Sequence, residues 1–212
     1  MKSKIEQYEK EYRAFNPFNH FKLRIKDMEN KSDYGAEVAM KWSEVVSQNL
    51  MNETYPAVHP IGQETFSLFA EFSTGIFEYA LDIDGATSLI KDRNIKPVTF
   101  SPSNIFKSVD QGNINKDPNR IKPNHKNPVM VIKSKYLTDD RKYCINGNHR
   151  ILKAYRKNDE QIKVFVFNDL EFIPFFYDVI SKAMYFLEID YDNVMNGKRN
   201  FISNEKNVFV YD

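Results

Sequence analysis

Four consecutive residues, Gly147, Asn148, His149 and Arg150, combine a flexible turn with groups that suit anion binding. They follow an apolar run that ends at Asn146, and an amphipathic run comes directly after them. A helix that begins near Asn148 would point its free backbone N–H groups and the positive end of its dipole at this turn. An Arg guanidinium in the first helical turn adds bidentate donors for phosphate oxygens. The pattern predicts a phosphate site made by Asn146, Gly147, Asn148, His149 and Arg150.

Each of these side chains has more than one expected role. Arg150 suits phosphate, although it could also be an ordinary surface Arg on a basic helix. His149 is expected to bind phosphate, to transfer a proton, or to hold the turn by hydrogen bonding. Asn146 is expected to bond a phosphate or to brace the loop, while Gly147 permits the tight backbone turn.

The elements that must position this turn are three strand-like runs and one helix. Apolar residues dominate 129–132, 143–145 and 162–167, and a helical pattern covers 148–158 between the second and third runs. This order predicts an α+β protein with a small mixed sheet built from about Val98 to Phe167.

The strand, the GNHR turn, the helix and the strand that follows resemble the core of the ParB/sulfiredoxin superfamily, over about residues 96–168. Residues 98–106 resemble the first strand and short helix of that family, and 116–123 resemble its Pro/Arg segment. In these relatives the box wraps nucleotide phosphates, so the resemblance implies a nucleoside triphosphate, ATP or CTP, with Mg²⁺. It adds Arg120 to the expected phosphate-binding residues and Asp117 to the catalytic ones, beside His149.

The sequence departs from the relatives at Asn148. Sulfiredoxins carry a cysteine there and ParB proteins a glutamate, so sulfinic-acid reductase chemistry is not expected. Kinase relatives use an acidic residue elsewhere as general base, for which Asp110, Asp117, Asp139 and Asp140 are the candidates. No helix-turn-helix signature follows the core.

Two classes of function remain open. The first is a nucleotide-binding protein, acting as a Mg²⁺-dependent phosphotransferase or nucleotide hydrolase. The second is a nucleic-acid-binding module or a nuclease of the same superfamily. Charge supports a phosphate ligand in both, because residues 116–157 contain twelve Lys and Arg against three Asp. A solvated lysine-rich face is the alternative explanation of this charge.

Composition narrows the class of protein. The chain has 212 residues, is 42% hydrophobic, and has one cysteine, which excludes a disulfide framework and a Cys-rich zinc site. That residue, Cys144, is expected to be a buried structural thiol on an interior strand. No apolar run reaches the roughly 20 residues that span a bilayer, and the charged start lacks a signal-peptide core, so we expect a cytoplasmic protein without membrane contact.

The rest of the chain is expected to form helices around this core. The predicted division is a mostly helical annex over 1–92, the core over 93–168, and a C-terminal helix and tail over 169–212 packed on the core. His20 is expected to lie on the surface. The pattern further predicts helices at 3–15, 33–50 and 63–72 and a strand or short helix at 77–83. Near the C-terminus it predicts a helix from Asp169 or Pro174 to residue 189 and a final strand at 207–212.

Overall fold

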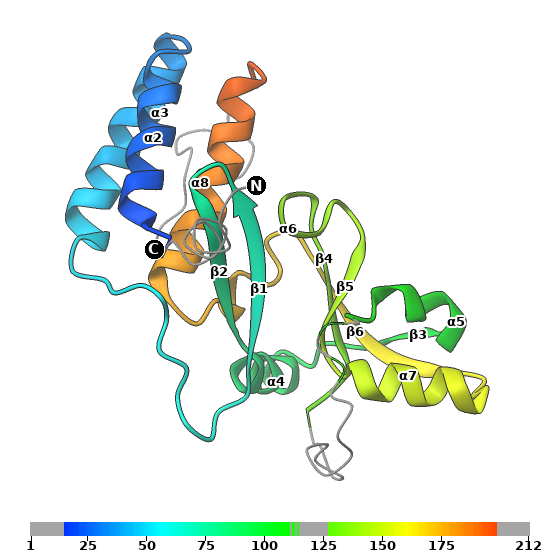
Figure 1. Cartoon of the computed structure of the whole chain (residues 1–212). Coiled ribbons are helices and arrows are strands. Elements are labelled where there is room, and N and C mark those ends of the chain that lie inside the picture. The colour runs from blue at the N-terminus through cyan, green and yellow to red at the C-terminus, as the bar shows by residue number, and fades with distance from the viewer. Residues whose placement is uncertain (1–14, 111, 113, 115–126, 199–212) are drawn as a thin grey trace, which may run out of the picture. The chain divides into compact units, whose positions relative to one another are not determined.

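The computed structural model describes residues 15–110, 112, 114 and 127–198, and its fold is α+β (Figure 1). The chain divides into two compact units, the first made of Met1–Val58, Ser67–Ala80 and Tyr177–Asp212, the second of His59–Phe66 and Leu81–Phe176. The division in chain order that the sequence suggested stays a prediction. The expected helix at 3–15 and strand at 207–212 fall outside the described residues.

Within its described residues, the first unit contains the helices α2 (Pro17–Glu29), α3 (Asp33–Val45, extended by a π-helical turn over Val46–Leu50) and α8 (Val179–Met195). Each begins at a side-chain cap, supplied by Asn16, Ser32 and Asp178 respectively. The predicted helix at 33–50 is confirmed. The C-terminal helix begins at Val179 rather than at Asp169 or Pro174, because Asp178 provides the cap and only a short 3₁₀ turn precedes it.

A β-hairpin of β1 (Thr65–Phe72) and β2 (Gly75–Asp82) replaces one of the predicted helices. The helix expected at 63–72 is wrong: Leu68 is buried and Phe69 is exposed, the alternation of a strand with one covered face. The strand expected at 77–83 is confirmed as β2. Residues 67–80 of this hairpin belong to the first unit, whereas residues 65–66 at the start of β1 and 81–82 at the end of β2 belong to the second.

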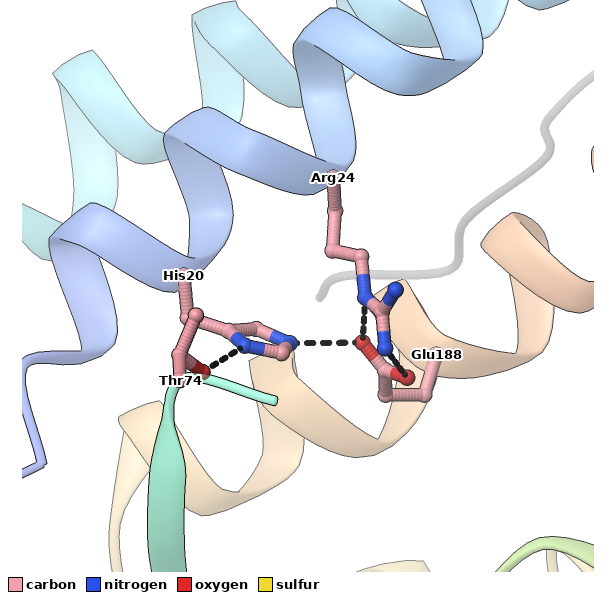
Figure 2. A network of polar contacts seen from close by, with 4 residues as sticks. All are labelled: His20, Arg24, Thr74 and Glu188. Atoms are coloured by element: carbon pink, nitrogen blue, oxygen red, sulfur yellow. Dashed lines mark hydrogen bonds and ion pairs between the residues drawn. The ribbon is translucent and has the colours of Figure 1, made fainter. Parts of the chain in front are cut away.

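A polar network lies inside the first unit (Figure 2). His20 is fully buried, with Nδ1 2.6 Å from Thr74 Oγ1 and Nε2 2.8 Å from Glu188 Oε1. Arg24 donates to both oxygens of the same carboxylate, from Nε at 2.8 Å and from Nη2 at 2.9 Å. The expectation of a surface His20 is therefore wrong, because partners from distant positions in the sequence enclose the ring.

The second unit contains a four-stranded mixed sheet in the order β3-β6-β4-β5. Strand β4 is parallel to β6, whereas β3 pairs antiparallel with β6 and β5 antiparallel with β4. The strands span Val98–Phe100 (β3), Met130–Lys133 (β4), Lys142–Asn146 (β5) and Ile162–Asn168 (β6). The predicted strands thus share one sheet, as expected.

Helix α4 (Ile83–Asp92) precedes the first strand of this sheet. The strands are connected by α5 (Pro102–Ile105) with a 3₁₀ turn at Phe106–Ser108, by α6 (Lys135–Thr138) and by α7 (Asn148–Lys157). One sheet face packs against α5 and α7 (Figure 1). The buried cluster contains Ile105, Val109, Val129, Val131, Cys144, Ile151 and Val164. Among the described residues, no helix is long and apolar enough to cross a membrane.

Cys144 is buried as expected, although β5 is an edge strand and not an interior one. Its thiol lies 3.2 Å from the Asn146 carbonyl oxygen, and burial raises its pKa to about 12. The thiol is therefore protonated near neutral pH, which supports a structural role for this residue.

Candidate functional site

The turn between β5 and α7 has the backbone conformation that the sequence predicted. Gly147 has a φ of 97°, in the left-handed region, and is the residue before the first turn of α7. Its carbonyl accepts from the N–H groups of Arg150 at 2.9 Å and Ile151 at 3.1 Å. In the described part of the chain, no side chain caps this end of α7. The backbone N–H groups at this end of the helix are therefore not capped by a side chain of the described residues.

Arg150 folds its guanidinium back over this turn. A Cβ added to Gly147 would lie 3.0 Å from Arg150 Nη2 and 2.9 Å from Val129 Cγ2, so only glycine leaves room for both neighbours. Nη2 is buried and has no hydrogen-bond partner within the described residues. The side chain as a whole is partly buried, and this corrects the expectation that an Arg in the first helical turn would be exposed.

Burial lowers the pKa of the Arg150 guanidinium, while Cys144 and Glu64 raise it. A buried cationic N–H group without an acceptor is unfavourable, and an anionic oxygen placed against it would relieve that cost. The geometry around Gly147 and Arg150 is therefore suited to an anion.

The two asparagines that flank Gly147 are engaged with the protein itself. Asn146 is buried, and its side-chain amide donates to the Pro128 carbonyl at 2.9 Å. Asn148 is also buried, and its Oδ1 accepts from the Asp110 N–H at 3.0 Å. These two side chains brace the turn. For Asn146 this is one of its two expected roles, the other being a hydrogen bond to phosphate. The donors that the turn offers to a ligand include its backbone N–H groups and Arg150.

Asp110 is the one acidic candidate that the structure ties to the turn directly. Its backbone bonds to Asn148, and its carboxylate accepts from the Tyr143 hydroxyl at 2.7 Å and from the Gly112 N–H at 2.9 Å. Burial raises the pKa of Tyr143, and the hydrogen bond to Asp110 raises it further. By contrast Asp139 and Asp140 lie in the turn after α6, where both side chains are exposed.

His149 occupies the first turn of α7 and is partly buried. Asp117 and Arg120, the other expected catalytic and phosphate-binding residues, lie outside the described residues. The five predicted site residues that the structure describes, 146–150, are consecutive in sequence, and the functional roles of all seven candidates stay predictions.

A carboxylate pair that the sequence did not suggest lies beside the turn. Asn127 Nδ2 donates to Glu64 Oε2 at 2.5 Å and to Asp84 Oδ1 at 2.8 Å. The Glu64 N–H donates to the other oxygen of Asp84 at 2.7 Å, which fixes the two acids together. Asn127 directly precedes Pro128, whose carbonyl accepts from Asn146, so one short segment joins this carboxylate pair to the turn at Gly147.

The carboxylate pair provides the type of ligand that Mg²⁺ prefers. Magnesium binds through one or two carboxylates and completes its coordination with water and substrate phosphates. Glu64 and Asp84 supply two such groups, and against the lowering by burial the Glu64 carboxylate raises the pKa of Arg150, so the chemistry of this donor pair fits Mg²⁺. Among the described residues, no three His, Cys, Asp or Glu side chains gather into a larger metal site.

Sequence reasoning missed these acids for a physical reason. Glu64 directly precedes β1 and Asp84 lies in the first turn of α4, where an acidic residue is common because it favours the helix dipole. Neither position carries a motif, and only the fold brings them to Asn127. Comparison of the chain with family models, with curated proteins and with solved structures found no significant match.

Proposed function

We propose that the turn at Gly147–Arg150 binds the phosphate groups of a nucleoside triphosphate, ATP or CTP, and that the protein is a Mg²⁺-dependent phosphotransferase or nucleotide hydrolase. The observation that carries this proposal is the buried, unpartnered Nη2 of Arg150, which lies over Gly147 at an uncapped helix N-terminus. A phosphate oxygen would pair with that nitrogen and with the backbone N–H groups of the turn. The resemblance of the GNHR turn to the ParB/sulfiredoxin box supports a nucleotide as the source of the phosphate.

In this proposal the residues around the turn have separate tasks. Gly147 allows close approach of the phosphate, and Arg150 neutralises its charge. Glu64 and Asp84 would hold Mg²⁺ against the phosphate oxygens, where the ion offsets negative charge that develops during phosphoryl transfer. His149, in the first turn of α7, would donate or accept a proton at the reacting oxygen.

The Arg150→Ala variant tests the phosphate site. Loss of a charge-assisted hydrogen bond costs about 1.5–3 kcal/mol, which corresponds to a rise in nucleotide Kd of roughly 10- to 150-fold. Isothermal titration calorimetry with ATP, CTP, GTP and their diphosphates, with Mg²⁺ present, measures this change. Arg156→Ala is the matched control, because Arg156 is an exposed cation on the same helix. Equal affinity in the Arg150→Ala variant and the wild type would refute the site.

The variants Glu64→Gln and Asp84→Asn test the carboxylate pair. Each amide keeps an oxygen that can accept from Asn127 while its negative charge is lost. Asp84→Asn gives up one of the two oxygens that accept from Asn127 and from the Glu64 N–H, so the Tm of this variant is compared with that of the wild type before binding is measured. Nucleotide affinity should then no longer depend on Mg²⁺, and affinity without Mg²⁺ should be unchanged or higher, because two repelling charges are gone. A full Mg²⁺ dependence in the double variant would show that these acids do not hold the ion.

A further inference from the structure

Helix α7 carries a surface of cations that continues away from the phosphate turn. After Arg150, the exposed side chains of this helix include Lys153, Arg156 and Lys157. Neither α7 nor the α5 helix and 3₁₀ turn packed against it contains an Asp or Glu between its bounds. The positive charge of this surface is therefore not offset by acidic neighbours in these elements.

Three of these cations form one line. Arg150, Lys153 and Lys157 are spaced i, i+3 and i+7, so they lie on the same side of α7. At 1.5 Å per residue, Lys153 is displaced by about 4.5 Å and Lys157 by about 10 Å from Arg150 along the helix axis. A ligand that contacts all three must therefore carry negative charge well beyond a single phosphate group.

The charge on the other side of the turn has the opposite sign. Glu64 and Asp84 are joined through Asn127 to the segment that packs on Asn146 and Gly147, at the end of β5 that precedes α7. One Mg²⁺ ion held by the two carboxylates would offset the charge of the single phosphate group at the turn. Without the ion these carboxylates disfavour a polyanion that continues in that direction, whereas the cations of α7 favour one that runs along the helix. The asymmetry places the end of a polyanion, and not its middle, at the turn.

We propose that the physiological ligand of this site is a single-stranded nucleic acid whose terminal phosphate occupies the turn and whose following phosphates lie along Arg150, Lys153 and Lys157. The proposal rests on the phosphate site described above and names its substrate class. A free nucleotide is then the smallest ligand of the turn, and the strand gains further affinity from the cations of α7. Recognition of the backbone is electrostatic, so it does not depend on base sequence.

The test measures binding of fluorescent eight-nucleotide strands by anisotropy. The strands carry a 5′-phosphate, a 3′-phosphate or no terminal phosphate, and the fluorophore is on the opposite end. A strand with one of the two terminal phosphates should bind at least about 10-fold more tightly than the strand without one, since a charge-assisted hydrogen bond is lost from the latter. Equal binding of all three strands would overturn the assignment of a strand end.

The double variant Lys153→Gln/Lys157→Gln tests the line of cations. Each phosphate contact to a single strand contributes about 0.7 to the slope of log affinity against log salt, so loss of two should reduce that slope by about 1.4. Affinity for ATP should stay within about twofold, because both residues lie beyond the turn. Lys91→Gln/Arg93→Gln is the control, since it removes two exposed cations from α4 and the segment after it.

The outcomes separate this inference from the nucleotide site. If Lys153→Gln/Lys157→Gln and its control bind the strand equally while Arg150→Ala loses ATP, the strand proposal is wrong and the nucleotide site stands. If Arg150→Ala keeps full affinity for both ATP and the strand, the phosphate site itself is refuted. Inorganic polyphosphate is included as a competitor: if it binds more tightly than the phosphorylated strand, with the same dependence on Lys153 and Lys157, the ligand is not a nucleic acid.

Discussion

Asp190 on α8 should make the stability of the first unit depend strongly on pH. The carboxyl group is fully buried, and Oδ2 accepts a hydrogen bond from Trp42 Nε1 at 2.9 Å. Oδ1 is buried without a hydrogen-bond partner in the described part of the chain. Burial raises the pKa of Asp190 to about 8, against the lowering effects of the Trp42 hydrogen bond and of Lys41.

The direction of the effect follows from proton binding. Between the unfolded pKa of 3.8 and the folded value of about 8, the folded state holds a proton on Asp190 that the unfolded state has released. The free energy of unfolding therefore falls as pH rises through this interval. At about 1.4 kcal/mol per pH unit, the loss between about pH 5 and pH 8 is on the order of 4 kcal/mol.

Asp190→Asn removes the titrating proton while keeping an oxygen for the Trp42 N–H. Urea unfolding followed by fluorescence reports on this unit, because Trp42 is the single tryptophan of the chain. The free energy of unfolding of the variant minus that of the wild type should increase as pH rises from about 5 to 8. The increase should be on the order of 4 kcal/mol, the loss worked out above for the wild type. The exposed substitution Glu37→Gln should leave the pH profile as in the wild type. Parallel profiles for Asp190→Asn and the wild type would refute a raised pKa at Asp190.

Three further predictions concern other contacts. Glu188→Ala should lower the free energy of unfolding by about 3–5 kcal/mol, because the partly buried Arg24 guanidinium loses its bidentate partner. Urea unfolding followed by Trp42 fluorescence measures this loss. Gly147→Ala should cost about 1–3 kcal/mol through its positive φ and the close Val129 contact, seen as a lower Tm, and a Tm equal to that of the wild type would contradict the turn geometry. Cys144 should react with a thiol reagent at pH 8 only when the protein unfolds, since its thiol is buried with a pKa of about 12.

The sheet of the second unit was predictable because its signals are local. The apolar runs at β4, β5 and β6 are short and bounded by polar turns, and the glycine at 147 separates a strand from an amphipathic helix. Each of these elements is specified by residues within about ten positions of one another. The same locality explains why the predicted phosphate turn has the expected backbone conformation.

What the sequence did not show depends on residues far apart in the chain. The segment 65–72 became a strand because it pairs with β2, and pairing overrides a pattern that also fits a short helix. His20 is buried because Thr74 and Glu188 approach it from 54 and 168 positions away. Glu64 and Asp84 come together where both accept from Asn127, 63 and 43 positions away in the sequence. Long-range contacts of this kind leave no periodic signal in one sequence.

The order of segments in the first unit has a consequence for synthesis of the protein. Helices α2 and α3 pack against α8, which ends at Met195, whereas residues 81–176 between them belong to the other unit. During synthesis, the sheet with the turn at Gly147 emerges from the ribosome before α8 emerges. Because domains generally fold as units during synthesis, the second unit should reach its native state first, and α2 and α3 must wait with their apolar faces uncovered. Helices α2 and α3 are thus synthesised first but reach their packed state last. Until α8 is available, their exposed apolar faces are the surfaces on which a chaperone would act.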